Sequence, residues 1–170
     1  MGNYIFAFFG IAVIVFILAL IAKKVANGEL SSGQYDERQE LERGKGFKAG
    51  FFTMLVYFLL YGAWDSMTGI VWCDTLVGMI IGICLGIFAF AAYCIVKDAY
   101  MSINDQPKRF YILFGAVGLM NMLLGLSHII DGEVIQNGKL NDNMLNFFIG
   151  VIFLGLCAVL FWKNKKDGME

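Results

Sequence analysis

The stretch TLVGMIIGICLGIFAFAAYCIV, Thr75–Val96, contains no charged residue. A helix rises about 1.5 Å per residue, so crossing a ~30 Å hydrocarbon core takes roughly 20 residues. A run of this length and apolarity predicts a transmembrane helix.

Four other stretches come near the same length. In chain order, the second of the five stretches is short. We extend it toward the N-terminus through Phe47 and Lys48, because a lysine near a helix end can reach the interface with its ammonium group. The first is interpreted as a true helix, since its basic residues follow the apolar run instead of preceding it. The predicted spans are about 4–22, 47–64, 75–96, 110–130 and 143–162.

Composition agrees with a membrane protein. Of the 170 residues, 59% are apolar and only 16% are charged, whereas soluble domains carry about 25% charged residues. A soluble domain this small could not bury so much apolar surface. We therefore predict an all-α chain, a polytopic membrane helix bundle of about five transmembrane helices. Residues 1–170 would form a single membrane domain in the lipid bilayer.

Basic residues predict how the helices are oriented, because cytoplasmic loops carry an excess of lysine and arginine. The odd-numbered spans end on a side that carries twelve of the thirteen basic residues, and the exception is Lys139. We expect this side to be cytoplasmic. The N-terminus is then outside, the C-terminus is in the cytoplasm, and the protein is a multi-pass protein of the plasma membrane.

Charge and cysteine usage narrow the chemistry. The net charge of −1 leaves no basic surplus, so no nucleic-acid partner is expected. The four cysteines show neither the paired spacing of a zinc site nor a C-x-x-C motif. A single histidine with scattered carboxylates is thin support for a zinc site, which needs three protein ligands. We expect no metal, no cofactor and no catalytic residue set.

The most specific stretch is YDERQELERGKGFK, Tyr35–Lys48, which begins in the predicted cytoplasmic loop 23–46. Asp36 can cap a helix start, and the acidic residues that come first suit the helix dipole. Oppositely charged residues follow at helical spacings, for example Glu42 and Lys45. We predict a short amphipathic helix that lies at the inner membrane surface and leads into the second span.

This motif, Tyr-Asp-Glu-Arg-Gln followed by Arg-Gly-Lys-x-Phe-Lys, resembles that of a group of small bacterial membrane proteins of unknown function. Those proteins look like chains of four or five helices with the motif on the first cytoplasmic loop. Their members are often found beside small DNA-binding regulators or transporter components. The resemblance covers about fifteen residues, and it implies no activity, ligand or catalytic residue.

The motif has two interpretations. It could dock onto a cytoplasmic or membrane protein partner, or onto anionic headgroups. Alternatively, it is a solvated helix whose charges pair with one another and which only orients the second span. The predicted docking residues are Asp36, Glu37, Arg38, Gln39, Arg43, Lys45 and Lys48.

Polar residues gather toward the outer half of two spans. Residues four apart share a helix face, and polar side chains in membrane helices usually face the bundle interior. They could line a pocket open to the outside that holds a carboxylate–imidazole pair, although a structural hydrogen bond is the commoner role for the lone histidine. The residues of this predicted outer pocket are Tyr57, Tyr61, Asp65, Asp74, Asn121, His128 and Asp131.

Three glycines in the third span, Gly78, Gly82 and Gly86, form a ridge of small residues at i, i+4 and i+8. Such a ridge lets a neighbouring backbone approach closely. It could be the seam of a homo-oligomer or, as we favour, a contact inside one bundle.

Three functions remain open. The favoured one is a non-enzymatic membrane protein, an accessory, sensory or immunity-type module that acts through a partner by its charged cytoplasmic loop. The first alternative is a small oligomeric transporter or channel with a polar path open to the outside. The second alternative is a membrane-embedded enzyme that uses His128 with Asp65 or Asp131. The lack of charge inside the spans lowers the case for coupled transport.

Overall fold

The computed structural model describes residues 16, 20, 35–102 and 107–167. The chain divides into two units, Met1–Gln34 and Tyr35–Glu170, and every element below belongs to the second. Apart from residues 16 and 20, the predicted first span lies outside the described residues, and so does the loop that follows it as far as residue 34. The elements are α2 (Glu37–Thr68), α3 (Thr75–Val96), α4 (Pro107–Ile130), β1 (Ile135–Gln136), β2 (Lys139–Leu140), η1 (Asp142–Met144) and α5 (Leu145–Asp167).

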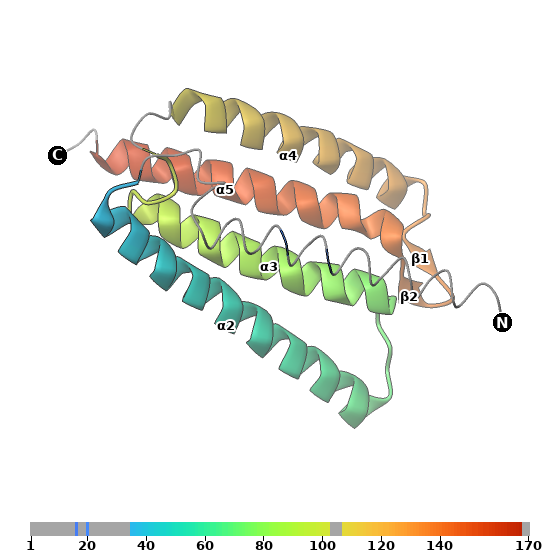
Figure 1. The fold of residues 1–170 in the computed structure, drawn as a ribbon. Coiled ribbons are helices and arrows are strands. Elements are labelled where there is room, and N and C mark those ends of the chain that lie inside the picture. Colours follow the sequence, from blue (N-terminus) through green and yellow to red (C-terminus); the bar gives the residue numbers. More distant parts are fainter. Residues whose placement is uncertain (1–15, 17–19, 21–34, 103–106, 168–170) are drawn as a thin grey trace. The chain divides into compact units, whose positions relative to one another are not determined.

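Two helical hairpins make up this unit. Helix α2 packs on α3, and α4 packs on α5, while α3 and α5 pack on each other. Figure 1 shows the resulting order α2, α3, α5, α4, with α3 and α5 running in the same direction between the two outer helices. Helices far apart in sequence, α3 and α5, therefore form the centre.

The unit has two distinct ends (Figure 1). At the motif end, α2 and α4 begin and α3 and α5 finish. At the β-hairpin end, the other ends of these helices meet the small β1–β2 hairpin. Of the basic residues in the described part of the chain, all except Lys139 belong to the motif end.

Helix α2 differs from the prediction. It is one continuous helix of 32 residues, about 48 Å long at 1.5 Å per residue, which exceeds the ~30 Å hydrocarbon core. It begins with a capping box, in which the Asp36 carboxylate accepts from the Gln39 backbone N–H at 2.6 Å and the Gln39 side chain accepts from the Asp36 backbone N–H at 3.2 Å. The residues predicted as a short amphipathic helix that leads into the second span form the first turns of α2, with no break before the span.

The β1–β2 hairpin was not predicted. Its two-residue loop is Asn137–Gly138, and both residues have positive φ, 52° and 76°. Asparagine followed by glycine is the usual pair for such a turn. Leu140 on β2 then bonds to the loop between α2 and α3, donating to the Trp72 carbonyl at 3.0 Å and accepting from the Asp74 N–H at 2.8 Å. The hairpin thus ties the two helical hairpins together at this end.

The glycine ridge of α3 faces α2 within the same chain. A Cβ atom added at Gly78 would lie 2.6 Å from the Tyr61 ring, and one at Gly82 would lie 2.5 Å from the Tyr57 ring. At Gly86 the added Cβ would lie 3.0 Å from the Gly50 carbonyl oxygen. The ridge is used for the contact inside one bundle, which was the favoured interpretation.

Apolar residues divide between a narrow interior and broad outer faces. Ile95, Phe114 and Leu160 form the centre of one buried cluster, and Val77 lies in a second cluster near the β-hairpin end. Many large apolar side chains of α2 and α4 are exposed, as expected of surfaces that contact lipid. Four described helices are long and apolar enough to cross a membrane. These features indicate a multi-pass membrane protein built as a helix bundle.

Candidate functional site

The site begins with the way α3 ends. Asp98 takes a left-handed backbone conformation with φ 54°, and its N–H donates to the Ile95 carbonyl at 3.2 Å. The Ala99 N–H donates to the Cys94 carbonyl at 2.8 Å. These two bonds form a Schellman motif, which satisfies two of the four carbonyls that a helix end leaves without partners. The carbonyls that follow point away from α3 and need other donors.

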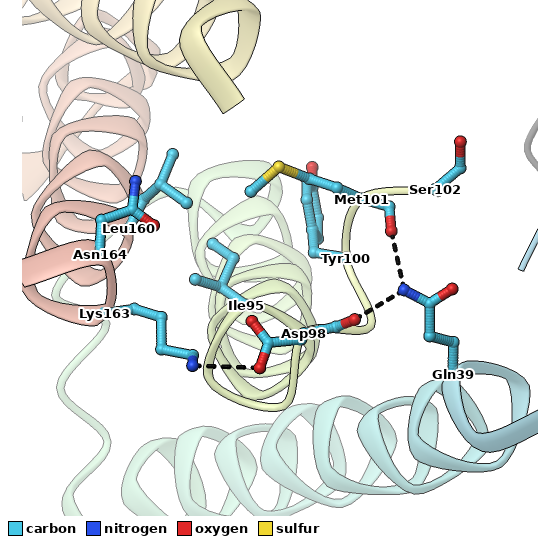
Figure 2. Close-up of a pocket in the computed structure, with 9 residues that line it drawn as sticks. All are labelled: Gln39, Ile95, Asp98, Tyr100, Met101, Ser102, Leu160, Lys163 and Asn164. Carbon is cyan, nitrogen blue, oxygen red and sulfur yellow. Dashed lines mark hydrogen bonds and ion pairs between the residues drawn. The ribbon is translucent and has the colours of Figure 1, made fainter. Parts of the chain in front are cut away.

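The motif at the start of α2 supplies those donors. Arg38 donates to the Lys97 carbonyl at 3.1 Å, and Arg43 donates to the Ala99 carbonyl at 3.2 Å. Gln39 Nε2 donates to the carbonyls of Asp98 and Met101, at 2.7 and 3.2 Å, as Figure 2 shows. Cationic and amide donors suit the negative end of the α3 dipole. Three motif residues therefore hold the turn that follows α3.

Gln39 occupies the central position of this contact. Its side chain is 7% exposed although it is polar, and burial of a polar group is tolerated when its hydrogen-bonding groups are satisfied. Its oxygen serves the capping box of α2, and its nitrogen serves the α3 turn. One side chain thus links the start of one helix to the end of another.

Helix α5 reaches the same turn through a lysine. The Lys163 ammonium lies 3.0 Å from the Asp98 carboxylate and 2.7 Å from that of Asp167. The Lys163 side chain is only 14% exposed, whereas that of Asp98 is 59% exposed. The cation is therefore largely covered and balanced by two carboxylates, and the carboxylate of Asp98 remains open to solvent.

These contacts surround a pocket of about 230 Å³. Figure 2 shows the start of α2 on one side, the α3 turn in the middle and the end of α5 on the other side. Apolar and polar side chains both line it, so it can hold an apolar group while hydrogen-bonding its polar tip. The lining residues are Gln39, Ile95, Asp98, Tyr100, Met101, Ser102, Leu160, Lys163 and Asn164.

A second cavity of about 270 Å³ lies beside Arg43. The Arg43 guanidinium stands 4.2 Å from the centre of the Tyr35 ring, within cation–π distance. Tyr100 lines both cavities. Burial raises the pKa of the Tyr100 hydroxyl, and the nearby Arg43 offsets part of that rise, so this phenol stays protonated at neutral pH.

Most of the predicted docking residues make contacts with other residues of the same chain. Asp36 and Gln39 cap α2, and Arg38 and Arg43 hold the α3 turn. Lys45 also has a partner within the chain, since its ammonium group lies 2.6 Å from the Glu42 carboxylate. Glu42 in turn accepts a hydrogen bond from the Tyr93 hydroxyl at 2.7 Å. Glu37 and Lys48 are exposed and make no side-chain hydrogen bond or ion pair with another described residue.

The predicted outer pocket forms only in part. Tyr57 and Tyr61 stack with ring centroids 6.0 Å apart against the α3 glycines. Tyr61 and Asp65 line a cavity of about 140 Å³ at the β-hairpin end. Asp74 is exposed and precedes α3 without capping it through its side chain.

The α4 members of that predicted pocket lie elsewhere. Asn121 donates to the Val117 carbonyl of its own helix at 2.9 Å, and Asp131 is exposed in the turn that follows α4. His128 Nδ1 lies 2.9 Å from the Glu133 carboxylate. Because α3 and α5 stand between α2 and α4 (Figure 1), His128 does not join Asp65 in one site.

Sequence reasoning missed Asp98, Lys163 and Glu133. The only signal for the first two was their position at helix ends on the basic side of the chain, which many residues share. No three histidine, cysteine, aspartate or glutamate side chains among the described residues are placed to hold a metal ion. Comparisons with protein-family models, with curated proteins and with solved structures find no match to this chain.

Proposed function

We propose that this chain is a bacterial plasma-membrane protein whose motif end faces the cytoplasm. The excess of basic residues at this end supports the orientation. With the apolar stretch 4–22 as a fifth span, the N-terminus is outside and the C-terminus is cytoplasmic. Because of its motif, we group the chain with the small bacterial membrane proteins of unknown function that it resembles.

Its proposed function is non-enzymatic, that of an accessory, sensory or immunity-type module that binds a partner protein at the motif end. The observation that carries this proposal is the pocket between α2, the α3 turn and α5. Three motif residues build one wall of it by holding the α3 turn. The motif thus acts by shaping a surface and not by extending freely into the cytoplasm.

The pocket suits one side chain of a partner. Protein interfaces concentrate binding energy in residues such as Tyr, Trp and Arg that enter a well-packed pocket. Ile95 and Leu160 offer apolar contact there, while the exposed Asp98 carboxylate can accept hydrogen bonds from the end of an inserted side chain. Glu37 in the first turn of α2 and Lys48 about three turns further along are both exposed, and their charges can orient the partner.

The experiment must block the pocket without breaking the fold. Charge reversal at Arg38 or Arg43 would remove bonds to the α3 turn, so it would affect folding and docking together. Asn164 is exposed on α5, lines the pocket and donates to the Tyr111 hydroxyl at 2.9 Å. Asn164→Trp fills the opening from one side, and Asn164→Ala loses the same hydrogen bond without filling the pocket. Lys165→Trp is the matched control, because Lys165 is the exposed neighbour that does not line the pocket.

The measurement is native mass spectrometry of the protein extracted gently from its host membrane. We expect the wild type, Lys165→Trp and Asn164→Ala to retain a second polypeptide, and Asn164→Trp to lose it while keeping the thermal stability of Asn164→Ala. A wild-type protein that carries no second polypeptide, or a partner retained by Asn164→Trp, would contradict the proposal.

A further inference from the structure

A small cavity at the β-hairpin end is lined by three aromatic rings and one carboxylate, together with Ile70, Val71 and Thr75. Its volume is about 140 Å³, below the 300–1,000 Å³ of pockets for drug-sized ligands. It therefore has room for a small organic group only. The side chains used in the argument below are Tyr61, Trp64, Asp65 and Trp72.

Two elements bring these side chains together. Tyr61, Trp64 and Asp65 are spaced by three and four residues near the end of α2, so they share one helix face. Trp72 comes from the loop that joins α2 to α3. Its ring meets that of Tyr61 edge to face, with centroids 5.9 Å apart and an interplanar angle of 76°.

The loop is held in place before any ligand arrives. Gly69 ends α2 in the left-handed conformation, with φ 63°, and its N–H donates to the Asp65 carbonyl at 2.9 Å. The Trp72 carbonyl accepts from the Leu140 N–H at 3.0 Å. The Tyr61 hydroxyl lies 3.7 Å from the Cys73 sulfur. A site that is already ordered loses little freedom on binding, which favours affinity.

The lining selects a cation. Aromatic faces carry partial negative charge and attract ammonium groups, most strongly in the case of tryptophan. The Asp65 carboxylate makes no hydrogen bond or ion pair with any other residue in the described part of the chain. No lysine or arginine lines the cavity. An anion would be repelled by the Asp65 carboxylate, and a neutral apolar group would gain nothing from its charge, because Asp65 is exposed and bonds to water.

We propose that this cavity, the aromatic cage, binds the ammonium group of an organic cation, with Tyr61, Trp64 and Trp72 around its substituents and Asp65 balancing its charge. The ligand is either a free quaternary or primary ammonium compound or the ammonium headgroup of a lipid. Both present the same chemistry to the cage. This site lies at the opposite end from the pocket for the partner, so the two proposals stand or fall separately.

The test uses the tryptophans of the cage as reporters. The chain has three tryptophans, and Trp162→Phe removes the one on α5, so that the two cage residues are the only tryptophans left in the chain. Nanodiscs without the protein give the background emission. The protein is placed in nanodiscs of phosphatidylglycerol, which has no ammonium group. Choline chloride is then titrated against sodium chloride at equal ionic strength, and against 3,3-dimethylbutanol, the uncharged isostere of choline.

We expect a saturable change in emission with choline and none with the isostere. Asp65→Asn keeps the shape of the side chain and should weaken choline binding about tenfold, because the paired charge is lost. Asp74→Asn is the matched control, since it removes an exposed carboxylate at the same end that does not line the cavity, and it should leave the affinity unchanged.

The proposal is overturned if choline gives no saturable response, if the isostere responds equally, or if Asp65→Asn and Asp74→Asn behave alike. Tryptophans that serve only as interfacial anchors would give those results. Repeating the titration in two kinds of mixed nanodisc identifies the source of the ligand. Both kinds hold the same share of phosphatidylglycerol, so that the surface charge is equal, and the rest is phosphatidylethanolamine in one and an uncharged galactolipid in the other. A weaker apparent affinity with phosphatidylethanolamine shows that a lipid headgroup occupies the cage, and an equal affinity shows that a free cation does.

Discussion

The Gln39 side-chain nitrogen lies 2.7 Å from the carbonyl oxygen of Asp98, a residue 59 positions later in the chain. This bond joins the start of α2 to the end of α3, and the Gln39 oxygen completes the capping box of α2 at the same time. The motif that was read from the sequence as a docking surface is therefore first a structural device. Its function follows from the surface that it holds in place.

Replacing Gln39 with alanine should lower stability markedly. The change removes the donor of two partly buried hydrogen bonds, to the carbonyls of Asp98 and Met101, and removes half of the capping box. An unsatisfied buried polar group costs about 1–3 kcal/mol, so the melting temperature should fall by several degrees at roughly 2–4 °C per kcal/mol. Thermal unfolding in detergent measures it. Glu40→Ala, an exposed neighbour in the same turn, should shift the melting temperature by less than a degree or two.

Two glycines of α2 should respond oppositely to alanine. At Gly50 a Cβ atom would lie 2.6 Å from the Gly86 carbonyl oxygen, and backbone atoms can move away only if α2 and α3 separate. We expect Gly50→Ala to cost about 1–3 kcal/mol. At Gly62 nothing lies within 4 Å of the added Cβ, so Gly62→Ala should stabilise the helix by about 0.5–1 kcal/mol. Equal melting temperatures for the two variants would contradict the observed α2–α3 packing.

Removing the Tyr57 hydroxyl should not weaken the protein. This oxygen is buried and has no hydrogen-bond partner among the described residues, so the folded state gains nothing from it while its desolvation costs free energy. We expect Tyr57→Phe to keep the free energy of unfolding or raise it by up to about 1 kcal/mol. Tyr61→Phe is the comparison, because it loses the contact with the Cys73 sulfur at 3.7 Å. If Tyr57→Phe is less stable than the wild type and than Tyr61→Phe, the Tyr57 hydroxyl has a partner such as a bound water.

The orientation of the bundle can be tested with reporter fusions. A fluorescent protein that matures only in the cytoplasm should be active when fused after Glu170, and a phosphatase that works only outside should be inactive there. Inserted at the Asn137–Gly138 turn, which joins exposed positions at the β-hairpin end, the two reporters should show the reverse pattern. The same activity at both positions would rule out the proposed topology.

Several elements were readable from local sequence. The third span was predicted as 75–96, and α3 covers the same residues, because the charged residues at both sides mark its limits. One local signal was present and was not used, the pair Asn137–Gly138, which indicates a β-hairpin. Asp36 was recognised as a helix cap, and Gln39 three residues later completes the pattern of a capping box.

The candidate site could not be predicted in the same way. Helical spacing correctly put Tyr61 and Asp65 on one face of α2, and it also put Asn121 and His128 on one face of α4. Spacing does not say which faces meet. Since α3 and α5 lie between the outer helices, His128 pairs with Glu133 of the following turn and not with Asp65.

By itself, the sequence determined that this is an apolar, helical chain with alternating basic and non-basic connections, since length, hydropathy and charge act locally along the chain. Only the tertiary structure decided the order of the helices, the use of Gln39 and Arg43 to hold the α3 turn, and the meeting of Trp72 with Tyr61. Those contacts join residues far apart in sequence or across a turn. They depend on which helix faces pack most closely, and the glycines of α3 set that choice through their contact with α2.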